Sequence, residues 1–420
     1  MTDPGPPDRA DPDTAVPPAS APRKARRAHR LIVGFFAAVL AVAIVVITAE
    51  EIRVAGDAAE RPGVAAFYAQ PSPAPAGAPG DILKSEELLG APAGARAWRL
   101  MYHSRDLNDA DVIVTGILVV PLTPPPAGGR TIVSWGHPTT GSATDCAPSS
   151  GFDPFFLIEG LRALLDRGYA VVGTDYLGMG TPGANSYLIG ETAGNNVLDA
   201  VRAAQHIPAV NASDRVVLWG HSQGGQAVLF AAERAATYAP ELKIQAVAAA
   251  APAADLTSLM AAHLDDISGV TIGSYAFAAY AGVYGPSVAG ADLADILTPA
   301  AVALIPQMTS LCLLSNITEL HRIGEPLVGA FTSRDPTKTE PWAGLFAENS
   351  AGQTGFDAPL FLAQGLDDTL VVPADTQAFA QHEASLGIDV TYEPISSATH
   401  GTVAYLAVPA LMEFLDAKVR

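Results

Sequence analysis

Residues 215–225 read Arg-Val-Val-Leu-Trp-Gly-His-Ser-Gln-Gly-Gly, and this stretch decides the fold. A short apolar run ends at Gly220, and an alanine-rich amphipathic run follows over 226–238. The pattern predicts a strand, a sharp turn and a helix, with Ser222 at the turn. Because Gly220 and Gly224 have no Cβ atoms, the two arms of the turn can pass close together. The Ser222 hydroxyl is then exposed at the carboxyl edge of a sheet, where a nucleophile is typically found.

The rest of the sequence extends this alternation of strands and helices. Strand-like apolar runs cover 97–103, 112–120, 131–135, 169–175, 216–219, 244–249, 360–363 and 390–393. Helix-like amphipathic runs cover 155–167, 192–206, 226–238, 373–386 and 402–418. Two opening strands followed by alternating units predict an α/β fold, with a mostly parallel central sheet and helices on both faces.

Residues 254–355 break the alternation. They are alanine-rich, and their pattern predicts helices at 256–263, 275–284, 291–304 and 311–321. The insertion precedes the strand that leads to a candidate acid, so we expect it to cover the carboxyl edge of the sheet as a helical cap. The main domain is predicted to span 81–420, with this cap inside it.

A nucleophilic serine needs a base, and the base needs an acid that orients it. In a fold of this kind the chain order is serine, acid, histidine. His400 lies between the last strand and the last helix, and we predict that it is the base for Ser222. Asp367 and Asp368 both follow the strand 360–363. The Gly-x-x-Asp-x-x-Val spacing favours Asp368 as the acid and leaves Asp367 as the alternative.

Stabilisation of an oxyanion needs two N–H donors. The backbone N–H of Gln223, at the predicted start of a helix, is the first candidate. The second candidate is Thr139, in the Trp-Gly-His-Pro-Thr-Thr-Gly loop over 135–141. Loops of this position often carry glycine where Pro138 stands here.

Composition excludes several other classes. The formal net charge of −19 disfavours nucleic acids and anionic membrane surfaces as partners. The only cysteines are Cys146 and Cys312, and their spacing excludes a zinc cluster. They are either free thiols or one disulfide, depending on the compartment.

The amino-terminal region predicts export. Residues 1–30 form a predicted disordered cytoplasmic tail, and a basic run at 23–30 ends it. The uncharged residues 31–48 follow, which favours an uncleaved transmembrane signal-anchor over 31–49, with the body outside the cytoplasm. A cleaved signal peptide and secretion are the alternative. Residues 50–80 are predicted to be a Pro/Ala-rich linker.

Four sequence segments together carry a resemblance to a known family. They are Gly136–Gly141 with Cys146–Ser149, Asp175–Gly183, Gly220–Gly225 and Gly365–Pro373. Over about 80–420 the chain resembles the α/β-hydrolase fold and, within it, the secretory lipase family of the fungal lipase A type, which has actinobacterial members.

The resemblance implies a role for each candidate. Ser222 would be the nucleophile, Asp368 the acid and His400 the base, with Gln223 and Thr139 as oxyanion donors. Family members use neither a metal nor a cofactor. They often have a disulfide between the segment after the oxyanion loop and the cap, and Cys146 and Cys312 occupy those two regions.

The sequence therefore predicts an extracytoplasmic serine ester hydrolase, a lipase or carboxylesterase that cleaves esters of hydrophobic acids through an acyl-enzyme. We expect a monomer that takes small or lipid esters and contacts the membrane through 31–48. An acyltransferase with the same triad and a non-catalytic anchored binding protein are the alternatives. Dehalogenases and epoxide hydrolases are disfavoured, because they use a carboxylate at the position of Ser222.

Overall fold

The computed structural model describes Thr48 and residues 64–419. The predicted tail at 1–30 and nearly all of the predicted anchor at 31–49 lie outside these residues. Within the described part of the chain, no helix is both long enough and apolar enough to cross a membrane.

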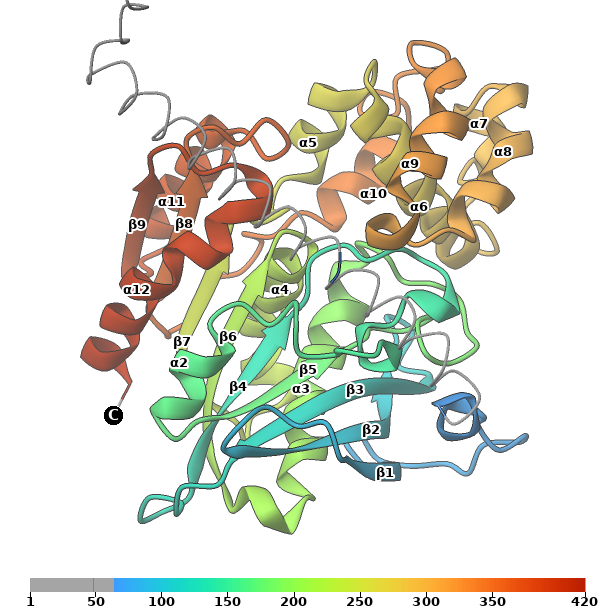
Figure 1. The fold of residues 1–420 in the computed structure, drawn as a ribbon. Coiled ribbons are helices and arrows are strands. Elements are labelled where there is room, and N and C mark those ends of the chain that lie inside the picture. The colour runs from blue at the N-terminus through green and yellow to red at the C-terminus, as the bar shows by residue number, and fades with distance from the viewer. Residues whose placement is uncertain (1–47, 49–63, 420) are drawn as a thin grey trace, which may run out of the picture. The chain divides into compact units, whose positions relative to one another are not determined.

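A nine-stranded sheet forms the centre of the described residues (Figure 1), in the spatial order β1-β2-β3-β5-β4-β6-β7-β8-β9. The strands are β1 (Ile82–Leu88), β2 (Ala95–Arg105), β3 (Asp111–Pro121), β4 (Arg130–Gly136), β5 (Ala170–Thr174), β6 (Ala212–His221), β7 (Lys243–Ala250), β8 (Leu360–Gly365) and β9 (Val390–Ile395). The pairs β1–β2, β2–β3 and β3–β5 are antiparallel. All the other pairs of neighbours in the sheet are parallel. The predicted α/β fold with a mostly parallel sheet is confirmed.

Helices cover both faces of the sheet. They are α2 (Leu161–Asp166), α3 (Gly190–Gln205), α4 (Gln223–Tyr238), α11 (Pro373–Ser385) and α12 (His400–Lys418). The helices α3, α4 and α11 enclose one apolar core with the sheet, and α2 and α12 enclose another. Successive strand residues point to opposite faces, so Leu218 belongs to the first core and Trp219 to the second.

The chain between β7 and β8 forms a separate group of helices, drawn at the upper right of Figure 1. They are α5 (Leu256–His263), α6 (Ile267–Tyr284), α7 (Leu293–Ile296), α8 (Pro299–Thr309), α9 (Leu313–Gly324) and α10 (Trp342–Glu348). We call this group the cap. Its core is aromatic, with Phe277 in edge contact with Trp342 and Phe346. The short helix α10 was not predicted from the sequence.

A disulfide ties the cap to the sheet. Cys146, in a 3₁₀ turn that follows β4, is bonded to Cys312, immediately before α9, with Cα atoms 5.3 Å apart. The Leu313 N–H also donates to the carbonyl of Thr140, at 2.8 Å. The loop that follows β4 is therefore held against the cap by a covalent bond and a backbone hydrogen bond.

The packed part of the chain begins earlier than residue 81. Phe67, inside the range predicted to be linker, is buried against Met101 and Ile113. The hydroxyl groups of Tyr68 and Ser149 lie 2.6 Å apart. These two aromatic residues attach the middle of the predicted linker to β2, to β3 and to the 3₁₀ turn that contains Ser149.

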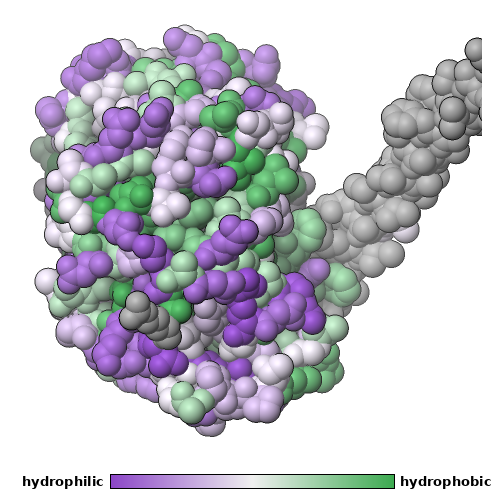
Figure 2. All heavy atoms as spheres, turned by 90° about the vertical axis from the view of Figure 1, so that its left-hand side faces the viewer, coloured by the Kyte–Doolittle hydropathy of each residue, from purple (hydrophilic) through white to green (hydrophobic). Residues whose placement is uncertain are grey.

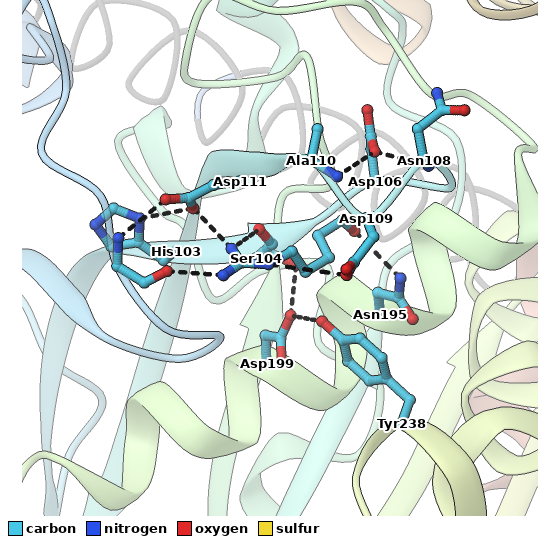
Figure 3. A network of polar contacts seen from close by, with 12 residues as sticks. His103, Ser104, Asp106, Asn108, Asp109, Ala110, Asp111, Asn195, Asp199 and Tyr238 are labelled. Carbon is cyan, nitrogen blue, oxygen red and sulfur yellow. Dashed lines mark hydrogen bonds and ion pairs between the residues drawn. The ribbon is translucent and has the colours of Figure 1, made fainter.

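A buried polar network joins β2 to α3 and α4 (Figure 3). Asp199 of α3 is fully buried, and one of its oxygens accepts hydrogen bonds from the hydroxyls of Ser104 and Tyr238, both at 2.6 Å. The other oxygen pairs with Arg202 at 2.8 Å. Burial raises the pKa of Asp199, although these three partners oppose the rise. Both carboxylate oxygens of Asp199 thus have hydrogen-bond or ion-pair partners, which is typical of a buried carboxylate with a structural role.

The face formed by β9, α11 and α12 is shown in Figure 2. Hydrophilic and hydrophobic residues are interspersed over it, as is usual for a solvated surface.

Candidate active site

Ser222 occupies the strained turn between β6 and α4. Its backbone has φ 55° and ψ −117°, a conformation that costs a residue other than glycine about 1–3 kcal/mol. Two hydrogen bonds hold the turn: the Ser222 N–H donates to Ala250 O at 3.0 Å, and Ser222 O accepts from the Ala253 N–H at 3.1 Å. A Cβ atom on Gly224 would lie 1.9 Å from Gly136 O, so only glycine fits there.

His400, the first residue of α12, faces this serine. Its Nε2 atom lies 2.9 Å from Ser222 Oγ. Burial lowers the pKa of His400, the hydrogen bond with Asp368 raises it, and the neighbouring His221 lowers it again, leaving it below its ordinary value. A neutral imidazole at this place can accept the proton of the serine hydroxyl.

Asp368, in the loop after β8, lies behind His400. Its Oδ2 atom is 2.8 Å from His400 Nδ1, and its Oδ1 accepts from the N–H groups of Leu370 and Val371 at 2.8 and 3.0 Å. Burial alone would raise the pKa of Asp368, but His400 and the two N–H groups outweigh burial and hold this pKa below its ordinary value. Asp367 is exposed. Of the two candidate acids, the structure brings Asp368 to the histidine.

The two candidate oxyanion donors lie beside the serine. Gln223 is the first residue of α4, and Thr139 belongs to the loop after β4; both are buried and line the same cavity as Ser222. The close approach of Gly136 to Gly224 brings this loop against the turn. The Thr139 hydroxyl is 2.7 Å from the Tyr187 hydroxyl, so this side chain is held in place.

The cavity over Ser222 is large and mostly apolar. Its volume is about 400 Å³, and both the sheet and the cap contribute to its wall. Its apolar lining includes Leu256, Met260, Ile272, Leu313, Leu314 and Phe346. The cap therefore supplies much of the surface that a bound molecule would contact. Among the described residues, no group of three or more His, Cys, Asp or Glu side chains is arranged to hold a metal ion.

Three side chains near the triad were not predicted to belong to the site. His263 of α5 bonds to Leu370 O through Nε2 at 2.8 Å, so a cap residue braces the loop of the acid. His221 lies next to the serine but turns its ring toward Glu159, in the loop before α2. Neither contact joins residues close in sequence, and no local pattern indicates it.

The carboxyl-terminal two thirds of the chain match a family model. The model is described as "Secretory lipase", and it matches residues 156–420. The chain belongs to the secretory lipase family. It is therefore a member of a family of carboxylic ester hydrolases, as the resemblance predicted.

Individual relatives are distant but cover most of the chain. Lipase 6 of Candida albicans is 25% identical over 84% of this chain and 80% of its own length. A Mycobacterium tuberculosis relative named "Probable inactive lipase" is 23% identical over 83% of this chain and 80% of its own length. The closed-state crystal structure of Candida antarctica lipase A superposes with a TM-score of 0.68 at 19% identity, covering 83% of this chain and 84% of that one. This likeness confirms the fold.

Proposed function

We propose that this family member is an active serine ester hydrolase for hydrophobic acyl groups, with Ser222, His400 and Asp368 as its catalytic residues. One observation carries the proposal. The three side chains form a continuous hydrogen-bonded chain, with links of 2.9 and 2.8 Å, and Ser222 and His400 line a mostly apolar cavity.

The geometry supports a two-step mechanism. Ser222 Oγ attacks the ester carbonyl while His400 Nε2 takes its proton, and Asp368 stabilises the imidazolium that forms. The N–H groups of Gln223 and Thr139 stabilise the oxyanion. His400 then gives the proton to the leaving alcohol. In the second step water, activated by the same imidazole, releases the acid and frees Ser222.

The cavity supports a hydrophobic acyl group as the substrate. Three of its lining side chains are also well exposed: Phe156 by 64%, Leu314 by 53% and Tyr405 by 45%. Apolar side chains at the mouth of a pocket favour contact with an apolar molecule, because burial gains about 25 cal/mol per Å².

We also propose that the catalytic residues lie outside the cytoplasm. Membership of a secretory family supports this, and so does the disulfide, which persists in an oxidising compartment. An uncleaved signal-anchor at 31–49 and a cleaved signal peptide would both place the catalytic residues outside the cytoplasm. Sizing the mature protein by mass spectrometry distinguishes them.

The test is ester hydrolysis by the full chain. We expect turnover of p-nitrophenyl butyrate and longer acyl esters, and loss of that turnover in Ser222→Ala. Equal rates for the two proteins would overturn the proposal. Running the assay with a long-chain alcohol present separates hydrolysis from acyl transfer, since transfer yields a new ester instead of free acid.

A non-catalytic role is the second candidate, because one relative is named a probable inactive lipase. The intact hydrogen-bonded triad argues against it for this chain. Labelling with a fluorophosphonate probe decides the matter. An activated Ser222 reacts with the probe, whereas a purely structural serine stays unlabelled.

A further inference from the structure

A second histidine–carboxylate pair, His221 and Glu159, contacts the candidate catalytic histidine His400. His221 Nδ1 is 3.0 Å from Glu159 Oε1, and His221 Nε2 is 3.0 Å from the backbone carbonyl of His400. The rings of His221 and His400 are tilted against each other, with centroids 5.1 Å apart. His221 is 4% exposed and Glu159 is 1% exposed, so both groups are shielded from water.

The hydrogen-bond partners of the two His221 ring nitrogens determine which of these nitrogens carry a proton. A backbone carbonyl only accepts, so Nε2 must donate to His400 O. A 3.0 Å contact between Nδ1 and a carboxyl oxygen also needs a proton between the two atoms. The other oxygen of Glu159 accepts from the Trp135 indole at 2.9 Å, which favours the carboxylate form. One proton therefore lies between His221 Nδ1 and Glu159 Oε1, and the Trp135 bond to the other oxygen favours an imidazolium with a carboxylate over a neutral pair.

Glu159 is held rigidly at this place. Besides the Trp135 bond to its side chain, its backbone carbonyl accepts from the Trp219 indole at 3.0 Å. The two tryptophans come from the adjacent strands β4 and β6 and are both buried. A buried carboxylate is costly without a charged partner, and His221 supplies one. The two tryptophan indoles and His221 therefore together hold Glu159 in place.

We propose that Glu159 and His221 are positioning residues for the reaction: their buried ion pair holds the backbone of His400 and keeps its imidazole neutral and ready to accept the proton of Ser222. This inference rests on the proposed function. It gives a role to His221, which precedes the nucleophile in the sequence and whose ring nitrogens bond to Glu159 and to His400 O.

The charges around His400 support this role. Asp368 faces it from the loop after β8 and favours protonation, whereas His221 from β6 and His263 from α5 oppose it. The positive end of the Glu159–His221 pair is the nearer end, because the His221 ring contacts His400 directly. His221 therefore lowers the pKa of His400, in the same direction as burial does.

The decisive variant is Glu159→Gln. The amide keeps the shape of the glutamate and can still accept from Trp135 while donating to His221 Nδ1. His221 then becomes neutral but still donates to His400 O. We expect the His400 imidazole to titrate about half a unit to one unit higher than in the unmodified protein. An NMR titration of the histidine ring nitrogens measures this without any substrate, so it remains valid even if the proposed hydrolysis fails.

Kinetics supply the second measurement. In Glu159→Gln the acidic limb of the kcat/KM profile should move to higher pH by the same amount. His221→Phe removes the bond to His400 O and should lower kcat by about tenfold or more with little change in KM, whereas His221→Gln restores a donor and should recover part of the loss.

Asp111→Asn is a matched control. It removes the charge of a carboxylate that is paired with another buried histidine, because Asp111 Oδ1 lies 2.9 Å from His103 Nδ1. This variant should leave the titration of His400 unchanged. An unchanged titration of His400 in Glu159→Gln would overturn the proposal. If that variant does not fold, the double variant Glu159→Gln with His221→Gln removes both charges and must show the same upward shift.

Discussion

His400 Nε2 lies 2.9 Å from Ser222 Oγ, although 178 residues separate the two in the sequence. The nucleophile follows β6 and the base begins α12, so the two meet only because parallel strands end at the same edge of the sheet. The cap occupies most of the intervening chain and encloses the space above them.

The first prediction concerns the pH dependence of hydrolysis. The base works only when His400 is neutral, and its pKa lies below the ordinary value of 6.5. Activity should therefore persist as the pH falls to 6.5 and disappear on further acidification through the lowered pKa. The kcat/KM profile for p-nitrophenyl butyrate measures this. An acidic limb centred above pH 7 would contradict the assignment of His400.

The second prediction separates the two neighbouring aspartates. Asp368→Asn keeps the shape of the side chain but favours the wrong imidazole tautomer, so kcat should fall by roughly 10³–10⁴-fold. Asp367→Asn changes an exposed residue and should stay within about twofold of the unmodified enzyme. Comparable losses in the two variants would show that the acid is wrongly assigned.

The elements and residues that the sequence predicted are those marked by a pattern within a few neighbouring residues. Ser222 stands between an apolar run and a helix, and His400 and Asp368 follow strands in the expected order. The cap helix α5 was predicted with its observed bounds, Leu256–His263. Each of these depends on periodicity or on turn chemistry within a few residues.

What the sequence did not indicate depends on contacts between distant segments. The edge strand β1 contains Lys84, Ser85 and two glutamates in place of an apolar run, and it becomes a strand by pairing with β2. The contact between His221 and Glu159 spans 62 residues. Neither partner has a distinctive neighbour in sequence, so only the fold reveals the pair.

The third prediction concerns stability and the buried Glu383. Neither of its carboxyl oxygens has a hydrogen-bond partner, and burial, with Glu233 nearby, raises its pKa to about 7. The folded state therefore holds a proton that the unfolded chain releases near pH 4.5, and stability should decrease as the pH rises from about 4.5 to 7.

Glu383→Gln removes this dependence. It should raise the free energy of unfolding by about 1–3 kcal/mol at pH 8 and leave it nearly unchanged at pH 4. Urea unfolding at both pH values measures the difference. Glu413→Gln, at an exposed position of α12, is the control and should have little effect at either pH. A Glu383→Gln protein less stable than the unmodified one at pH 8 would refute the explanation.

The fourth prediction concerns the disulfide. Cys146 and Cys312 are 166 residues apart, so their bond restricts a long loop in the unfolded chain. Replacing both by serine should lower stability by about 2–5 kcal/mol, and dithiothreitol should have a similar effect on the unmodified protein. The double variant should be insensitive to dithiothreitol, and thermal unfolding with and without the reductant checks both statements.

The last prediction concerns the space for the acyl group. Met260 of α5 lines the cavity over Ser222, and a larger side chain there shortens the available space. In Met260→Trp, the ratio of kcat/KM for p-nitrophenyl laurate to that for p-nitrophenyl acetate should fall by about tenfold, because only the long chain needs the lost volume. Leu386→Trp, at an exposed position after α11, leaves the cavity intact and should keep the ratio unchanged. If the ratio is unaffected in Met260→Trp while the protein remains folded, the acyl chain lies elsewhere, on the side of Phe156 and Tyr405.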